Sequence, residues 1–301
     1  MPLSEDPLIA RPAPAPSPAW ALVKRIVTDV RQNPSDDSPR LSQALLGEAA
    51  LVLAETGAWA QVQLDRDNCV GWVHARALHR CLQAEAVAYQ QACNALVSTE
   101  LLPAFHYLTP TRSSGGGLVA TGEAGKLPFG LTLPVVAQQE LWAAVQLPDG
   151  AQWWVSNILL PLTSRPRPDT PGLTFALDML RRCVGVPYLP GGRTPFGFDE
   201  AGLAQALWGL LDVRLPRHVL QQFEAGQPVE TEPQPGDLIF FGESDREAHR
   251  SVTHVGLSLG GDELIPANRH TWSVAIHSLD ARSPRYHAWL CDHLVGVRRF
   301  G

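Results

Sequence analysis

The sequence contains few cysteines, and no two of them form a Cys-x-x-Cys pair. The five are scattered along the 301 residues: Cys69, Cys81, Cys93, Cys183 and Cys291. A zinc site or a dense disulfide framework needs closely spaced or paired cysteines, so neither is expected here. We therefore predict no metal and no cofactor, and we expect small buried thiols in a reducing compartment.

The sequence also lacks long basic or apolar runs. Its net charge is −6, and no cluster of Lys and Arg suits nucleic acid or an anionic membrane as the main partner. No apolar run approaches the roughly 18–20 residues of a membrane span. The N-terminus, MPLSEDPLIARPAPAPSPAW, has no basic segment before an unbroken apolar one, so we expect no secretory signal and predict a cytoplasmic location.

An internal repeat occupies the first half of the chain. The segment WAQVQL at Trp59–Leu64 returns as WAAVQL at Trp142–Leu147, and a Trp-Val pair follows each copy. Short alternating segments between turn residues are typical of antiparallel β-barrels, so the repeat predicts two copies of a small barrel. The repeated tryptophans either form a ligand platform or fill the barrel cores, and core packing is the more common use.

The turn and tryptophan positions of the first copy follow a characteristic order. The four motifs are Gly47-Glu48, Gly57-Ala58-Trp59, Gly71-Trp72-Val73 and Leu78. In this order the first copy resembles the bacterial SH3 (SH3b) module. The second copy matches less closely, since Trp153-Trp154-Val155 replaces Gly-Trp-Val. The resemblance implies two SH3-like β-barrels in tandem.

Composition divides the chain into six segments. The first is rich in Pro and Ala, the third has helical spacing without Gly or Pro, and the fifth contains three prolines and a glycine. After it come two helical segments and then several short strands, which indicates an α+β domain. The predicted order is a tail at 1–18, a first barrel at 19–81, a connecting helix at 82–100, a second barrel at 101–163, a linker at 164–172 and an α+β domain at 173–301.

Five short motifs in the last segment follow one another in a family-specific order. They are Pro187-Tyr188 with Gly191-Gly192, then GFDEAGL at Gly197–Leu203, Leu215-Pro216-Arg217 with Gln222, PGDLIFF at Pro235–Phe241, and HVGL at His254–Leu257. With these motifs the segment resembles the NlpC/P60 family of cysteine peptidases over its whole length. The resemblance implies a papain-like α+β domain.

The resemblance also implies a chemistry. NlpC/P60 enzymes hydrolyse amide bonds of peptidoglycan peptides with a cysteine thiolate at a helix N-terminus, a histidine, and a third polar residue that orients the imidazole. Here Glu200 stands at the cysteine position and Pro266 at the third position, while His254 is retained. A carboxylate is a poor nucleophile for an amide and proline cannot orient an imidazole, so we expect no intact catalytic set.

Six residues are candidates for ligand binding in the cleft that the resemblance implies. They are Asp199, Glu200, His254, Tyr188, Arg217 and Glu48. Asp199 is the predicted N-cap of a helix over about 200–211, which places Glu200 in its first turn. We expect the Glu200 carboxylate roughly 2.6–3.2 Å from His254, in a groove beside the first barrel.

Three functions are compatible with these residues. The favoured one is a catalytically inactive relative of the γ-D-glutamyl peptidoglycan endopeptidases that binds a muropeptide-like ligand or a protein partner. The second is a cell-wall peptide hydrolase in which Glu200 acts as a general base for water. The third is a structural or assembly module with a filled cleft. An open polar cleft at Glu200 favours the first two, and a cleft plugged by its own side chains favours the third.

Overall fold

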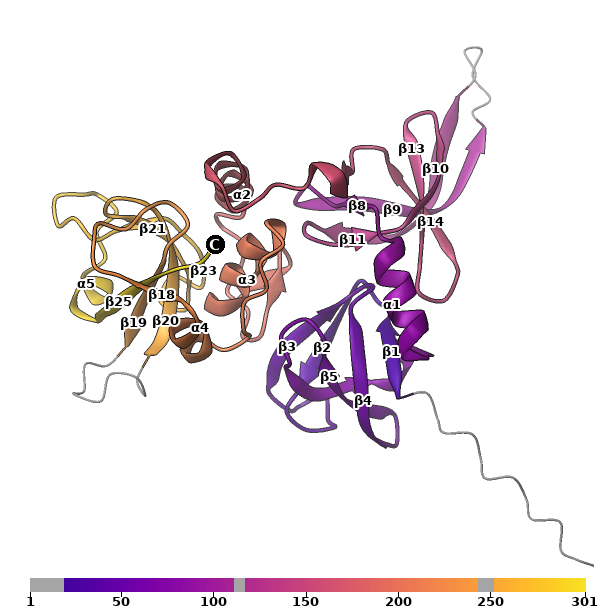
Figure 1. The fold of residues 1–301 in the computed structure, drawn as a ribbon, viewed down its shortest axis with the longest axis horizontal. Coiled ribbons are helices and arrows are strands. Elements are labelled where there is room, and N and C mark those ends of the chain that lie inside the picture. The colour runs from indigo at the N-terminus through magenta and orange to yellow at the C-terminus, as the bar shows by residue number, and fades with distance from the viewer. Residues whose placement is uncertain (1–18, 111–116, 243–251) are drawn as a thin grey trace, which may run out of the picture.

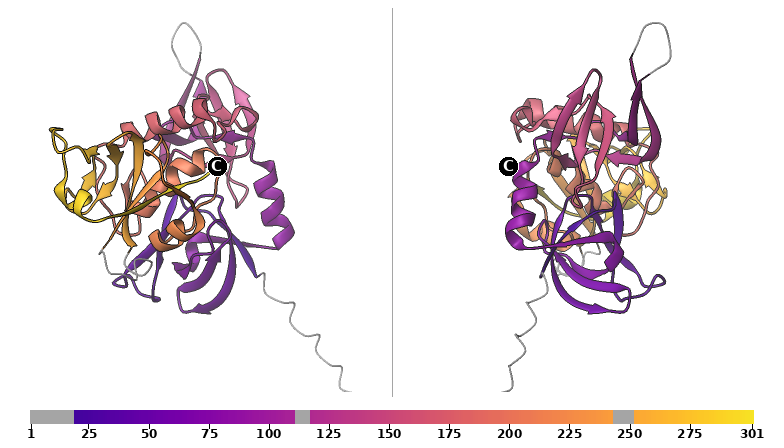
Figure 2. Two further views of the ribbon diagram at one scale, coloured as in Figure 1. Left: turned by 60° about the vertical axis from the view of Figure 1, so that its left-hand side comes forward. Right: turned by 90° about the vertical axis from the view of Figure 1, so that its right-hand side faces the viewer.

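The computed structural model describes residues 19–110, 117–242 and 252–301, and the predicted tail at 1–18 lies outside them. Three β-rich parts surround helix α3 (Glu200–Leu210), which lies at the centre of the molecule (Figure 1). We call them the first β-domain (β1–β7), the second β-domain (β8–β15) and the C-terminal domain. Helix α1 (Gln83–Ala92) runs along the outside between the two β-domains (Figure 2). Within the described residues, no helix combines the length and apolar character that crossing a membrane requires.

The first β-domain is a seven-stranded antiparallel sheet that curls around its own core. Strand β5 shows how the sequence builds this core, because Ala60, Val62 and Leu64 point inward and are fully buried. The sheet order is β3-β2-β6-β5-β4-β1-β7, and the strands are β1 (Trp20–Val23), β2 (Val27–Arg31), β3 (Arg40–Leu45), β4 (Ala49–Thr56), β5 (Trp59–Leu64), β6 (Val70–His74) and β7 (Leu78–Cys81).

The second β-domain has a five-stranded sheet, β10-β9-β14-β13-β12, and a three-stranded one, β11-β8-β15. Its core contains Leu102, Leu127 and Val145, and Leu45 and Leu46 of the first β-domain pack into it. The two β-domains are therefore joined by apolar packing. The strands are β8 (Ala95–Leu96), β9 (Leu101–Pro110), β10 (Leu118–Pro128), β11 (Thr132–Leu133), β12 (Val135–Gln139), β13 (Trp142–Gln146), β14 (Gln152–Ser156) and β15 (Leu160–Pro161).

The repeated segments form hairpins of the same register. In the first β-domain Gln61 of β5 is opposite Trp72 of β6, and in the second Ala144 of β13 is opposite Trp154 of β14. Gln61 and Ala144 are both the third residue of the repeat, so the register supports a duplicated module. That the second β-domain is an SH3-like barrel stays a prediction, as do the domain boundaries.

The repeated tryptophans do not fill the barrel cores, so that expectation was wrong. Trp59 and Trp142 are only partly buried, whereas the alanines that follow them, Ala60 and Ala143, are fully buried. Side chains alternate along a strand, so an inward alanine forces its neighbouring tryptophan outward. Trp59 instead stacks on His74, with 3.9 Å between the ring centroids.

The connecting helix is shorter than the predicted range 82–100. Helix α1 ends at Ala92, because Ala95–Leu96 forms strand β8 and pairs with β11 and β15. Asn94, two residues after the helix, ties the chain to the second β-domain, since its side chain donates to the Val135 carbonyl and accepts the Val135 N–H at 2.8 Å. These pairings satisfy backbone groups that a longer helix would have bonded internally.

The C-terminal domain is a six-stranded antiparallel sheet, β18-β25-β19-β20-β21-β24, with helices on both faces. In β19, Leu238 and Phe240 join the core with α2, α3 and α4, whereas Ile239 and Phe241 face α5. This is the predicted α+β arrangement. The helices are α2 (Thr170–Arg182), α3, α4 (Val219–Ala225) and α5 (Ala288–Asp292); the strands are β16 (Arg193–Thr194), β17 (Gly197–Phe198), β18 (Gln227–Val229), β19 (Leu238–Gly242), β20 (Val252–Gly260), β21 (Glu263–Ile265), β22 (Ala267–Asn268), β23 (Ser273–Val274), β24 (His277–Ser278) and β25 (Leu294–Arg299).

Two buried arginines attach the C-terminal domain to the first β-domain. Arg193 donates to the Gln43 carbonyl at 2.6 Å and to the Glu48 carboxylate at 3.0 Å. Arg217 donates to the Ser42 hydroxyl at 2.9 Å. A buried guanidinium must keep its acceptors, because an unpaired charge in this environment is costly. These contacts therefore fix how the first β-domain sits against the C-terminal domain.

We predict that Glu48→Gln destabilises the folded chain by roughly 3–5 kcal/mol, because Arg193 would stay buried without its ionic partner. The control is Glu55→Gln, which removes an exposed ion pair with Arg80 in the same β-domain and should cost about 1 kcal/mol or less. Urea denaturation of both variants measures the difference. Equal, small losses would show that Glu48 does not hold the interface together.

Candidate functional site

The candidate site is built around the N-terminus of α3. Asp199 is the N-cap, and its Oδ1 accepts the Gly202 N–H at 2.7 Å. Its Oδ2 accepts the Gly191 N–H at 2.9 Å and a hydrogen bond from Arg217 at 2.5 Å. Both carboxylate oxygens are thus engaged by the chain itself. A Cβ at residue 202 would lie 2.0 Å from the Gly192 carbonyl, so glycine is needed where the loop meets the helix.

Glu200 is the first residue of α3 and is 4% exposed. Its Oε1 lies 3.1 Å from His254 Nδ1 and 3.3 Å from Arg269 Nη2, and its Oε2 accepts the Tyr188 hydroxyl at 2.9 Å. The predicted hydrogen bond between Glu200 and His254 is confirmed. Both carboxylate oxygens have partners, as a buried carboxylate requires.

Glu200 is ionised in this environment. Burial alone would raise its pKa, but the hydrogen bond and charge of His254, a backbone N–H and the Tyr188 hydroxyl together hold the pKa of Glu200 below its ordinary value. An ionised carboxylate can only accept hydrogen bonds, so Nδ1 of His254 carries the proton between them. The imidazole therefore donates to Glu200.

The other nitrogen of the same imidazole, Nε2, has no partner among the residues that the structure describes. Within the described part of the chain, nothing hydrogen-bonds to the buried Nε2 of His254. Pro266 is buried nearby: its Cβ lies 3.4 Å from the place of a Cβ on Gly256, two residues after His254 on the same face of β20. An apolar ring thus stands in the region where the NlpC/P60 resemblance expects the orienting residue.

Two residues at the mouth of the site were not predicted. Arg269 reaches Glu200 from the loop after β22, and its guanidinium carbon lies 5.9 Å from the Tyr188 ring centroid. Trp272 meets the same ring edge-to-face at 5.9 Å. No motif or spacing marks either residue. Only the folding of the 269–272 loop over Tyr188 brings them to the site.

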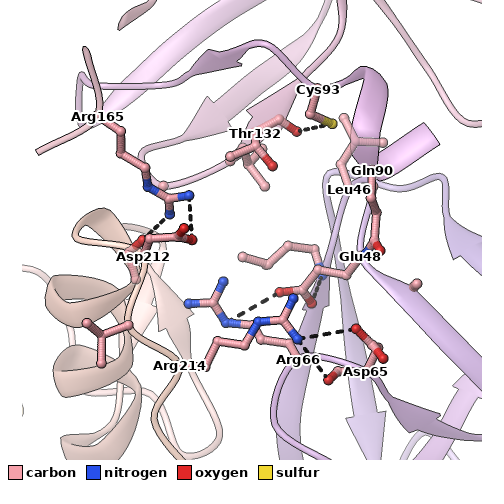
Figure 3. Close-up of a pocket in the computed structure, with 17 residues that line it drawn as sticks. Leu46, Glu48, Asp65, Arg66, Gln90, Cys93, Thr132, Arg165, Asp212 and Arg214 are labelled. Carbon is pink, nitrogen blue, oxygen red and sulfur yellow. Dashed lines mark hydrogen bonds and ion pairs between the residues drawn. The ribbon is translucent and has the colours of Figure 1, made fainter. Parts of the chain in front are cut away.

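Five of the six predicted ligand-binding candidates come together here, but Glu48 lies elsewhere. It lines a polar cavity of about 130 Å³ between the first β-domain, α1, the second β-domain and the end of α3. Figure 3 shows Arg66, Arg165 and Arg214 around this cavity. Burial, reinforced by Arg193, lowers the pKa of Arg66 to about 10. Glu48 pairs with Arg66 and Arg193, whereas Arg165 and Arg214 pair with aspartates. The contacts of Glu48 are therefore structural.

The cysteines do not replace the missing thiolate. Burial raises the pKa of Cys183 to about 12 and that of Cys69 to about 11, so both thiols stay protonated at neutral pH. Cys291 donates its S–H to the Leu279 carbonyl at 3.3 Å. In the ranges that the structure describes, no group of three or more His, Cys, Asp or Glu side chains is arranged to hold a metal ion.

Two protein families match parts of the chain. Residues 30–78 match the bacterial dipeptidyl-peptidase SH3 domain, and residues 185–293 match the NlpC/P60 family. The chain thus contains an N-terminal SH3-like domain followed by an NlpC/P60 family domain. These matches agree with the resemblance of the first barrel to the SH3b module and of the last segment to the NlpC/P60 family.

Two relatives match most of the chain. A γ-D-glutamyl-L-lysine dipeptidyl-peptidase of Bacillus cereus is 24% identical, over 99% of this chain and 86% of the relative. One of the same name from Bacillus subtilis is 26% identical, over 85% of this chain and 82% of the relative. A crystal structure of an NlpC/P60 family protein from Bacillus cereus has a TM-score of 0.74 at 21% identity and covers 93% of this chain and 99% of the other. The chain is therefore homologous to these dipeptidyl-peptidases and shares the fold of the solved structure.

We predict that the folded chain loses stability as the pH falls from about 6.5 to about 4. Burial, with His287 and His254 nearby, lowers the pKa of His277 from 6.5 to about 4. In that window the unfolded chain binds a proton at His277 and the folded chain does not, so acid favours unfolding. The lowered pKa of Glu200 adds a further loss at the acidic end of the window.

Thermal unfolding at pH 7.0 and 4.5 (roughly the edges of this window) measures the effect. His277→Gln should reduce the acid-induced fall in the unfolding temperature, and the exposed His218→Gln should leave it unchanged. The expected contribution of His277 is on the order of 1–3 kcal/mol. If His277→Gln keeps the full acid sensitivity, His277 is not its source.

Proposed function

We propose that this chain is a non-hydrolysing NlpC/P60 protein that binds a γ-D-glutamyl peptide at the Glu200 site. The observation that carries the proposal is the buried Glu200–His254 hydrogen bond, at 3.1 Å, at the position where the resemblance expects the thiolate and its histidine. Cysteine peptidases need a nucleophile that attacks the amide carbon, and an ionised carboxylate tied to its imidazole is poorly suited to that role.

The geometry also disfavours Glu200 as a general base for water. A general base works best with a pKa near the operating pH, which for Glu means a raised value. The pKa of Glu200 is lowered instead. His254, Tyr188 and Arg269 occupy its oxygens, and little of its surface is left for a water molecule. Hydrolysis through Glu200 is therefore the less favoured alternative.

The ligand class follows from the relatives. The two Bacillus proteins named γ-D-glutamyl-L-lysine dipeptidyl-peptidases align with more than four-fifths of their own lengths. A chain that kept the binding surface and lost the nucleophile would bind the same kind of peptide. We further propose that the second β-domain is a diverged SH3-like copy of the first. The cytoplasmic location stays part of this proposal.

A second candidate function is supported by one observation. Glu200 is 4% exposed and is covered by Tyr188 and Arg269, which is what a structural module with a filled cleft would show. The site differs from a filled cleft in one respect, because the Arg269 side chain that covers Glu200 is 60% exposed and is therefore within reach of a ligand. Binding of a peptide separates the two functions, since a filled cleft takes no ligand.

We predict that the chain binds L-Ala-γ-D-Glu-L-Lys without cleaving it. Isothermal titration calorimetry should show saturable binding, and mass spectrometry of the mixture should show only the intact peptide. Turnover that disappears in Glu200→Ala would support the hydrolase instead. Neither binding nor turnover would favour the structural module.

We also predict that Glu200→Cys alone does not restore appreciable cleavage, because Nε2 of His254 would still lack an orienting acceptor. Adding Pro266→His to Glu200→Cys should raise the rate by roughly 10²–10⁴-fold over the single variant. Pro266→His alone is the matched control and should be inactive. Equal rates for the single and double variants would show that the third position is not limiting.

A further inference from the structure

At the mouth of the Glu200 site, most donors of the Arg269 guanidinium have no hydrogen-bond partner among the described residues. Arginine has five N–H donors, and one of them reaches Glu200 at a long 3.3 Å. The side chain is 60% exposed and also approaches the Tyr188 ring. The forked face of Arg269 is therefore available to an acceptor from outside the chain.

Trp272, which approaches the same Tyr188 ring as Arg269, has a strained backbone. Its φ is +54°, a left-handed backbone conformation that is rare for a bulky residue and costs about 1–3 kcal/mol. Its carbonyl accepts the Tyr188 N–H at 2.9 Å, which fixes this conformation, and the residue is 67% exposed. Strain and an exposed large ring at one place are typical of a ligand-contact surface.

The charges around the site leave Arg269 free to take a second carboxylate. Glu200 is already stabilised by His254 and Tyr188, at 3.1 and 2.9 Å, and its contact with Arg269 is the longest of the three. Asp199 is neutralised by the buried Arg217. An arriving carboxylate would thus meet the cation of Arg269 without displacing the bonds that hold Glu200 in place.

We propose that Arg269 and Trp272 form a carboxylate-recognition element that selects the ligand of the Glu200 site. A γ-linked glutamyl residue leaves its α-carboxylate free, and this group pairs with the guanidinium fork of Arg269. The aliphatic part of the same peptide packs on the Trp272 ring. The inference rests on the proposed binding function. It adds that Arg269 determines the specificity and that the group it recognises is the α-carboxylate.

The test compares two peptides that differ only in that carboxylate. One is L-Ala-γ-D-Glu-L-Lys, and the other carries D-isoglutamine in place of D-glutamate, so that the α-carboxylate is an amide. Calorimetry with the wild-type chain should show the acid binding roughly 10- to 100-fold more tightly than the amide. Equal affinities of the wild-type chain for the two would overturn the inference, and this comparison needs no variant to fold.

Variants then assign the preference to Arg269. Arg269→Gln should lose the 10- to 100-fold preference, because it weakens binding of the acid far more than binding of the amide. Arg285→Gln is the matched control, because Arg285 is 54% exposed and likewise has one carboxylate partner, Glu263, at 2.8 Å. It should keep the preference in full. Asparagine tolerates the left-handed backbone, so Trp272→Asn should weaken the binding of both peptides by the same factor.

The outcomes separate this inference from the function on which it rests. Two outcomes overturn the inference alone. In the first, the wild-type chain binds the acid and Arg269→Gln binds it equally well. In the second, Arg269→Gln loses the same affinity for the acid and for the amide. No wild-type binding of either peptide overturns the proposed function as well. Selective loss of the acid in Arg269→Gln, with Arg285→Gln unchanged, supports both.

Discussion

The carboxylate of Asp199 is the constraint on which the rest of the site depends. It caps α3 through Gly202, holds the glycine loop through Gly191 and pairs with the buried Arg217. Arg217 in turn reaches Ser42 in the first β-domain at 2.9 Å. One buried ion pair thus fixes the helix start, the loop that carries Tyr188 and the neighbouring domain. Loss of either charge would leave the other buried and unpaired, so the arrangement depends on both.

A carboxylate is tolerated at residue 200 because this frame supplies what an anion needs. The first turn of a helix favours negative charge. The Tyr188 hydroxyl and the His254 imidazole offset the burial of Glu200, which by itself would raise the pKa of the carboxyl. The same features would stabilise a thiolate in a cysteine peptidase. The environment of an anionic nucleophile is therefore present, although the residue in it cannot attack an amide in the same way.

Much of this could be predicted from the sequence where short motifs decide local structure. Motif spacing predicts the Asp199 cap and the helix that follows it. It also predicts the contact between Glu200 and His254. The orientation of Trp59 could not be predicted. Alternating side chains show that Trp59 and Ala60 point to opposite faces of the sheet, but they do not show which of the two faces the core. Arg269 and Trp272 were missed because a loop without a motif carries them to Tyr188. The partner of Glu48 was missed because Arg193 lies 145 positions away in the chain.

The loss of folding stability that the site causes argues against a purely structural role. Within the described residues His254 keeps a buried Nε2 without a partner, which costs about 1–3 kcal/mol. A buried hydrogen-bonded pair such as Glu200–His254, which takes a carboxylate out of water, is often no more stabilising than apolar side chains of the same volume. Trp272 adds backbone strain and leaves its ring in water. A chain that needed only a filled cleft would be more stable without these three features. Their concentration around Tyr188, together with the exposed guanidinium of Arg269, is what a site that takes up a ligand beside Glu200 requires.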